Sequence, residues 1–267
     1  MSVPTGSVRR TPWCSRPAGS PDLSAEGGSH LSATTGTRIA DGNTPHTVSA
    51  TLVDQYGNPV PDIEVDFALA EGLAVAAGGS TTVSTNESGV AALDVVSSTA
   101  GTYDVTASVG GVQIVNGSPA TVAFSAGVVD MSQSSFTISP EGPLAAGSGA
   151  ESTYTGVVQA RDAGGNPVSG VTVVITAEPT VAEQPLVGTT DADGRMAVDF
   201  TSTVAQTSRL TAYLTVNGTA QPLPGSQPHV DRRCPGPDRG RQVDSVGHLG
   251  QSARRWGGRS HPDCHRA

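Results

Sequence analysis

The segment Asp191-Ala192-Asp193-Gly194 comes nearest to a metal site by residue type and spacing. A calcium loop of the EF-hand type also needs a third ligand at position five and a glutamate at position twelve. Those positions hold Arg195 and Ser202, which cannot complete the ligand set. We therefore predict a tight turn between two strands and no metal site, with weak calcium binding at the Asp191–Asp193 turn as the open alternative.

A second candidate metal cluster lies near the C-terminus, where His261-Pro262-Asp263-Cys264-His265 has an H-x₃-H spacing with Cys234 upstream. Zinc modules of this kind also contain a closely spaced cysteine pair. The only other cysteine is Cys14, so no such pair exists and no disulfide framework is expected.

Catalytic chemistry is not indicated. His46 is the only histidine between residues 38 and 228, and no G-x-S-x-G elbow or glycine-rich phosphate loop occurs. Carboxylates such as Glu64, Asp66, Asp94 and Asp104 alternate with apolar residues, which is typical of the solvated face of a strand. The sequence thus predicts a protein that is not an enzyme and has no cofactor.

A fifteen-residue phrase occurs twice, first at residues 53–67 and again at residues 160–174. A second shared phrase follows each copy. The matched pairs are Asp54 with Asp162 and Asn58 with Asn166 at an offset of 108, then Gly89 with Gly194, Asp94 with Asp199 and Ser97 with Ser202 at an offset of 105. A unit that recurs at this length is a domain, so two related domains are expected.

Both repeats alternate apolar and polar residues with a period of two, and no stretch has the spacing of a helix. Short strands separated by Gly, Asn and Pro turns predict an all-β fold of two antiparallel β-sandwiches. The residues expected to face inward are Val48, Leu52, Ile63, Val65, Phe67, Leu93, Val95, Val105 and Ala107 in the first repeat, and Val157, Val171, Val173, Ile175, Val198, Phe200, Leu210 and Ala212 in the second.

Four short motifs carry a resemblance to a known family. They are Ala40-Asp41-Gly42, Asp54-x-x-Gly57-Asn58-Pro59-Val60, Thr85-x-x-x-Gly89-Val90-Ala91 and Ala100-Gly101-Thr102-Tyr103-x-Val105-Thr106-Ala107. Together they resemble group 1 bacterial immunoglobulin-like (Big-1) domains, which occur in tandem in invasin- and intimin-like surface proteins. The resemblance covers residues 38 to 126 well and residues 137 to 220 less well, because Ala205-Gln206-Thr207-Ser208 replaces the last motif. It implies tandem immunoglobulin-like sandwiches with neighbouring repeats as partners and an extracellular or cell-surface location.

Charge excludes two classes of partner. Residues 38 to 228 carry 18 acidic residues against 4 arginines, and the whole chain has no lysine. An acidic body repels nucleic acid and anionic lipid, so neither is expected as a partner.

No run approaches the roughly 18 apolar residues of a membrane span, and residues 1 to 37 lack the apolar stretch of a secretory signal. We interpret the chain as beginning inside a longer gene.

Tandem sandwiches without a site favour a structural role, as a stalk or spacer of a cell-surface or secreted adhesin-like protein. One alternative is a module that binds a receptor or a carbohydrate, for which Tyr56 is the only aromatic anchor in its loop. Another is an accessory segment of a larger secreted enzyme. Only the flanking sequence would distinguish this last alternative from the stalk.

The two ends differ from the repeats. Residues 229 to 267 hold 8 of the 15 arginines and 4 of the 6 histidines without alternation, a composition expected of out-of-frame GC-rich DNA. We therefore predict an irregular segment at 1–35, domains at 36–128 and 129–228, and a disordered tail at 229–267. The second domain is predicted to lack its last strand, which would leave the edge of the strand at Leu210–Leu214 unpaired.

Overall fold

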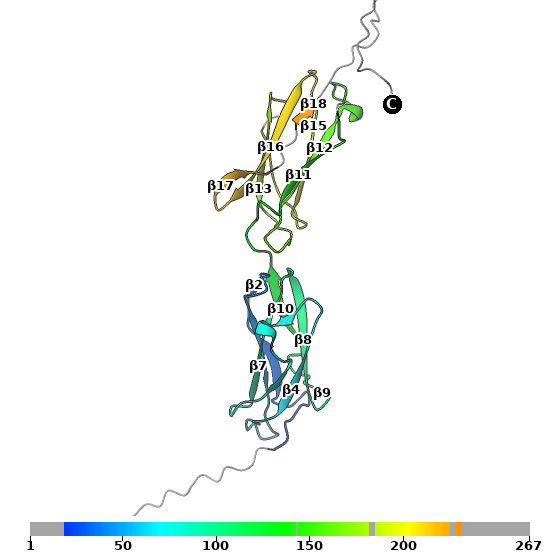
Figure 1. The fold of residues 1–267 in the computed structure, drawn as a ribbon. Helices are drawn as coiled ribbons and strands as arrows, with labels where there is room; N and C mark the ends of the chain where they lie inside the picture. Colours follow the sequence, from blue (N-terminus) through cyan, green and yellow to red (C-terminus); the bar gives the residue numbers. More distant parts are fainter. Residues whose placement is uncertain (1–18, 143, 182–184, 225–227, 231–267) are drawn as a thin grey trace, which may run out of the picture. The chain divides into compact units, whose positions relative to one another are not determined.

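The chain is described by a computed structural model that places residues 19–142, 144–181, 185–224 and 228–230. Nearly all regular elements in these ranges are strands, and the two helical turns are 3₁₀ turns at Ala76–Gly78 and Ala150–Ser152. The chain divides into a first unit, Met1–Val128 with Arg161–Asn166, and a second unit, Val129–Ala160 with Pro167–Ala267. The all-β prediction is confirmed (Figure 1).

The first unit is built from two sheets. One has the order β1 (His30–Ala33), β3 (His46–Thr51), β7 (Val90–Val96) and β5 (Ala74–Val75). The other has the order β2 (Thr37–Ile39), β10 (Ala120–Ser125), β8 (Gly101–Val109), β4 (Glu64–Leu69) and β6 (Thr82–Ser84), with β9 (Val112–Gln113) paired to β8. All these pairings are antiparallel except that of β2 with β10.

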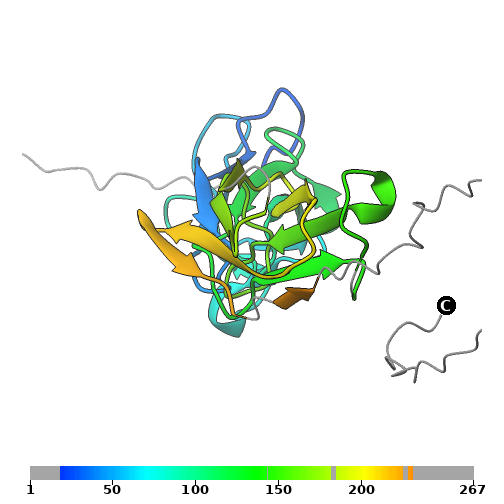
Figure 2. The same ribbon diagram turned by 90° about the horizontal axis from the view of Figure 1, so that it is seen from above.

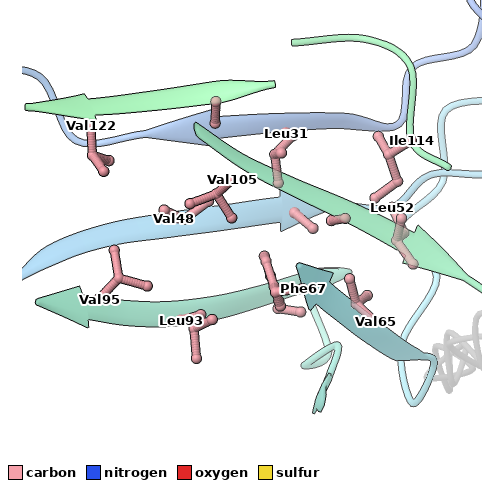
Figure 3. Close-up of a cluster of buried hydrophobic side chains, with 14 of the residues drawn as sticks. Leu31, Val48, Leu52, Val65, Phe67, Leu93, Val95, Val105, Ile114 and Val122 are labelled. Atoms are coloured by element: carbon pink, nitrogen blue, oxygen red, sulfur yellow. The ribbon is translucent and has the colours of Figure 1, made fainter. Parts of the chain in front are cut away.

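The core of the first unit lies between its sheets (Figure 3). Along β3 the buried residues alternate with half-buried ones, as the period of two requires. Val48, Val65, Val95 and Val105 have no exposed surface. Of the residues predicted to face inward in this repeat, only Ile63 is half-buried, and it packs against the same cluster.

The second unit repeats this plan with different strands. One sheet has the order β11 (Ser135–Ser139), β12 (Tyr154–Gln159) and β15 (Arg195–Phe200). The other has the order β14 (Leu186–Thr189), β13 (Thr172–Glu178), β16 (Thr207–Val216) and β17 (Thr219–Pro222). In addition, β18 (Pro228–Val230) pairs with β16 (Figure 1; Figure 2 shows the strands from above).

One predicted inward position in β12 is wrong. Val157 is only half-buried, whereas its neighbour Val158 has no exposed surface. The offset of 108 equates Val48 with Gly156, so the inward position between Tyr154 and Val158 on β12 is a glycine that carries no apolar signal. The rings of Phe136 and Phe200 fill that space: a Cβ on Gly156 would lie 3.1 and 3.3 Å from them.

Two predictions about the ends also need correction. The segment predicted to be irregular contains β1, because Leu31 is 3% exposed and inserts into the core. The missing last strand is likewise contradicted, since β18 pairs with β16 at Thr207–Arg209. This is the position that the closing strand β10 takes against β8 in the first repeat. The remainder of the predicted tail, from residue 231 onward, lies outside the described residues.

Candidate functional site

The loop Asp54–Asn58 is the part of the repeated phrase richest in polar groups. The Asp54 carboxylate accepts hydrogen bonds from the backbone amides of Tyr56 and Asn58, both at 2.9 Å, and from the Asn58 side-chain amide at 3.1 Å. Gly57 takes a positive φ of 81°, which glycine adopts without strain. The Asn58 side chain is the main cause that lowers the pKa of the Asp54 carboxyl, and the backbone amides of Asn58 and Tyr56 lower it further.

The second copy of this loop has the same internal geometry. The Asp162 carboxylate accepts from the Asn166 backbone amide at 2.8 Å and from its side-chain amide at 3.1 and 3.2 Å. Burial raises the pKa of the Asp162 carboxyl, but hydrogen bonds from the amide of Gly127 and from Asn166 outweigh it, and the pKa lies below its usual value. Both carboxylates thus act as anionic anchors for their own loops.

Each anchor also holds the chain segment that precedes it. The amide of Gly127 donates to Asp162 Oδ2 at 2.8 Å, and the amide of Gly19 approaches Asp54 Oδ2 at 3.4 Å. Gly19 and Gly127 are themselves 108 residues apart, although nothing in the repeated phrase pointed to them. Their common contact extends the repeat to the residues that lead into each domain.

A buried threonine supports the chain downstream of each loop. Thr85 Oγ1 donates to the carbonyl of Val60 at 2.8 Å and accepts from the amide of Ile63 at 3.0 Å. Thr190 makes the same two bonds with Val168 and Val171, at 2.8 and 3.0 Å. In each repeat one hydroxyl satisfies two backbone groups that would otherwise be buried without partners.

At Gly89 and Gly194 there is no room for a side chain. A Cβ on Gly89 would lie 2.4 Å from the carbonyl oxygen of Leu52, and one on Gly194 would lie 2.5 Å from that of Ala160. Both glycines also have positive φ, 72° and 70°. This close backbone approach explains why the two repeats share a glycine here.

The two remaining shared pairs are also structural. The Asp94 carboxylate accepts from Thr47 Oγ1 across β3 and β7 at 2.6 Å, and Asp199 accepts from Thr155 at the same distance. Ser97 Oγ and Ser202 Oγ each donate, at 2.8 Å, to the carbonyl two residues on, which closes a turn. The threonine partners belong to the same structural framework, and no motif in the sequence indicates them.

The turn at Asp191 has the geometry predicted for a hairpin. Asp191 Oδ1 accepts from the amides of Asp193 and Arg195 at 3.0 and 2.8 Å. Asn86 Oδ1 makes the equivalent bonds to the amides of Ser88 and Val90 in the first repeat. Among the described residues, no group of three or more His, Cys, Asp or Glu side chains could hold a metal ion. The His261–His265 cluster and the three cysteines lie outside those residues.

The residues weighed for catalysis are dispersed. His46 is fully buried, with Nδ1 2.9 Å from Thr34 Oγ1 and Nε2 3.0 Å from the carbonyl oxygen of Ala123. Asp66 and Asp104 accept hydrogen bonds from threonine hydroxyls on neighbouring strands, and Glu64 is exposed on β4. The structure brings none of these residues together as an acid, base and nucleophile.

A pocket of about 430 Å³ lies beside the first loop, lined by Gly19, Ser20, Pro21, Asp22, Asp54, Gln55 and Tyr56. Asp54 already accepts hydrogen bonds from its own loop, and the Asp22 carboxylate accepts from Ser24, so both carboxylates that line the pocket have hydrogen-bond partners within the chain.

Of the helices in the described part of the chain, none has the length and apolar character to span a membrane.

Comparison with known proteins places these features in a family. Residues 28–125 and 133–225 each match the bacterial Ig-like domain (group 1). The inverse autotransporter adhesin YeeJ of Escherichia coli (strain K12) is 28% identical over 204 residues, which cover 73% of this chain and 8% of that protein.

Two solved structures are similar to this chain, and the first of them supports the fold. The Escherichia coli adhesin FdeC superposes with a TM-score of 0.58 at 24% identity, over 81% of this chain and 65% of that one. Invasin, a bacterial integrin-binding protein, is 24% identical with a TM-score of 0.42, over 79% of this chain and 40% of that one. The two matched segments span most of the chain and coincide with the duplicated loop, threonine and glycine framework, and the chain therefore belongs to the bacterial Ig-like domain (group 1) family.

Proposed function

We propose that this chain is a structural segment, a stalk or spacer, of a bacterial cell-surface or secreted adhesin-like protein. One observation carries the proposal: the polar residues shared by the repeats are already engaged in intramolecular hydrogen bonds. Asp54 and Asp162, Thr85 and Thr190, and Asp94 and Asp199 all hold backbone or neighbouring side chains. A segment selected to bind or transform a ligand would instead present shared groups that point toward a common space.

The adhesin relative supports a cell-surface location and neighbouring Ig-like repeats as partners. Because the chain spans only 8% of the length of that relative, adhesion itself is a property we assign to the parent protein and not to these two domains. The absence of enzymatic activity belongs to the same proposal, and it is supported by the dispersion of His46, Asp66 and Asp104 over separate strands.

An exchange experiment tests this function. In the cell that produces the parent protein, residues 28–225 are replaced by two unrelated Ig-like domains of matched length, and surface display and adhesion are both measured. A spacer predicts that adhesion survives the exchange at equal display. Loss of adhesion at unchanged display would contradict the proposal and assign a receptor- or carbohydrate-binding role to these repeats.

A further inference from the structure

We infer that copies of this chain associate head to tail, through a docking loop in the first unit and a turn in the second unit of another copy. The docking loop is Asp54–Asn58, and the donor turn is Ser202–Ala205. The inference does not depend on the proposed spacer role. It rests on a contact that the structure already contains once, within the first unit.

That contact is made by Asn166, which belongs to the first unit together with the rest of Arg161–Asn166. Its Oδ1 accepts from the amide of Ala100 at 2.9 Å, and its Nδ2 donates to the carbonyl of Ser98 at 3.1 Å. The side chain of Asn166 is 5% exposed as a result. An Asp-x-x-x-Asn loop of this family can therefore receive a Ser-x-x-Ala turn by a paired backbone contact.

Asn58 is the equivalent residue in the docking loop, but among the described residues none covers its outer face. It makes the same bonds to Asp54 that Asn166 makes to Asp162. Unlike Asn166, it is exposed, and within the described part of the chain its Oδ1 accepts no hydrogen bond. The loop is preformed, so docking would cost little ordering entropy.

The donor turn offers the complementary groups. Ser202 Oγ donates to the carbonyl of Val204 at 2.8 Å and accepts from its amide at 3.2 Å, as Ser97 does with Thr99 at 2.8 and 3.0 Å. The offset of 105 equates Thr203 with Ser98 and Ala205 with Ala100. Both Thr203 and Ala205 are exposed, and among the described residues neither the Thr203 carbonyl nor the Ala205 amide is hydrogen-bonded.

Two exposed apolar side chains mark the same two surfaces. Tyr56 in the docking loop is 65% exposed, and Val204 in the donor turn is 61% exposed. Position 56 corresponds to Gly164, where a Cβ would lie 3.4 Å from the carbonyl oxygen of Ser98. A side chain at this position therefore lies beside an incoming turn, where Tyr56 would pack against Val204. The internal contact, which has Gly164 and Thr99 instead, lacks this apolar pair.

The docking loop and the donor turn are different surfaces, so the interface is heterologous, and a pair joined by one contact keeps one unused loop on one copy and one unused turn on the other. Association would then continue as an open series of copies. The patch is small, so we expect association only at high concentration or when copies are crowded on a surface.

Complementation between two variants of the full chain tests the inference by sedimentation velocity, in a concentration series that reaches on the order of 1 mM. Tyr56→Asp disables the loop and Val204→Asp disables the turn, and both positions are exposed, so folding should be retained. We expect the unaltered chain to associate progressively and each variant alone to remain monomeric. An equimolar mixture should form dimers and stop there, since one intact loop meets one intact turn.

Val187→Asp is the matched control, because Val187 is 62% exposed on β14 of the same unit and lies outside the turn. This variant should associate like the unaltered chain. The inference is overturned if the unaltered chain remains monomeric throughout, if either single variant still associates, if the mixture forms no dimer, or if Val187→Asp abolishes association equally.

Discussion

The two repeats share a polar framework but fill their cores differently. In the first unit, His46 and Val95 are paired across β3 and β7, and Val48 lies fully buried nearby. The corresponding set in the second unit is Tyr154, Phe200 and Gly156, with the two rings stacked at 5.7 Å between centroids. Phe200 and Gly156 in the second unit replace Val95 and Val48 of the first, so a larger side chain beside a glycine keeps the total side-chain volume similar.

The comparison shows which features of this fold are specific and which are interchangeable. The two hydrogen bonds made by each of Thr85 and Thr190 require a side-chain hydroxyl, which donates to one backbone group and accepts from another. Core positions require only apolar volume on the correct face, so they can exchange sizes in a compensating manner. The repeats thus preserve their turns more strictly than their core.

The largest expected effect comes from removing the Phe67 ring, which is 4% exposed in the core of the first unit. Phe67→Ala should lower the free energy of unfolding of the first repeat by about 3–5 kcal/mol, through lost burial and the cavity left behind. Chemical denaturation followed by residue-resolved hydrogen exchange would measure it. The second repeat, which does not contain this core, is the internal control; an equal loss there would contradict independent cores.

A smaller effect should follow from giving the second repeat the residue of the first at one core position. Gly156→Val places a side chain against Phe136 and Phe200 and should cost about 1–3 kcal/mol by overpacking. The double variant Gly156→Val with Phe200→Val restores the arrangement of Val48 and Val95 and should recover much of that loss. Thermal unfolding of both variants checks this, and no recovery in the double variant would refute volume compensation.

The Asp54 anchor should make the first repeat sensitive to acid. Because the folded pKa of Asp54 is lowered, its contribution is complete above the unfolded value of about 3.9 and is lost as pH falls through the folded pKa. Asp54→Asn should therefore destabilise the first repeat near neutral pH, with a deficit that shrinks below about pH 4. Denaturant titrations at several pH values measure it; a deficit independent of pH would rule out the charged anchor.

We expect calcium to leave the melting temperature of the chain unchanged. The Asp191 turn is closed by the amides of Asp193 and Arg195, as the Asn86 turn is closed by Ser88 and Val90. A ligand at 100 times its Kd would stabilise the fold by about 2.7 kcal/mol. The melting temperature of the full chain should be the same in excess calcium and in chelator, and a clear increase with calcium would establish a site at this turn.

Much of this framework could be predicted from the sequence, because its turns depend on residue types with narrow conformational preferences. The glycines and the Asp and Asn of the repeated phrase identify themselves in this way. Val157 was misplaced because Gly156 interrupts the apolar pattern, and β1 was missed because Leu31 is its only fully buried apolar residue. The contacts of Asn166 with Ser98 and Ala100 join residues far apart in the chain, and no local pattern indicates them.

We conclude that the residues shared by the repeats are structural and have the same role in each repeat. Native-state hydrogen exchange on the full chain tests it most directly, with Thr85→Val and Thr190→Val made separately. Each hydroxyl joins two backbone groups and is nearly buried, at 2% and 4% exposed. We expect each substitution to destabilise its own repeat by a similar amount, about 1–3 kcal/mol. Unchanged stability in both variants, or a loss of stability in only one of the two variants, would show that the shared threonines do not have the same structural role.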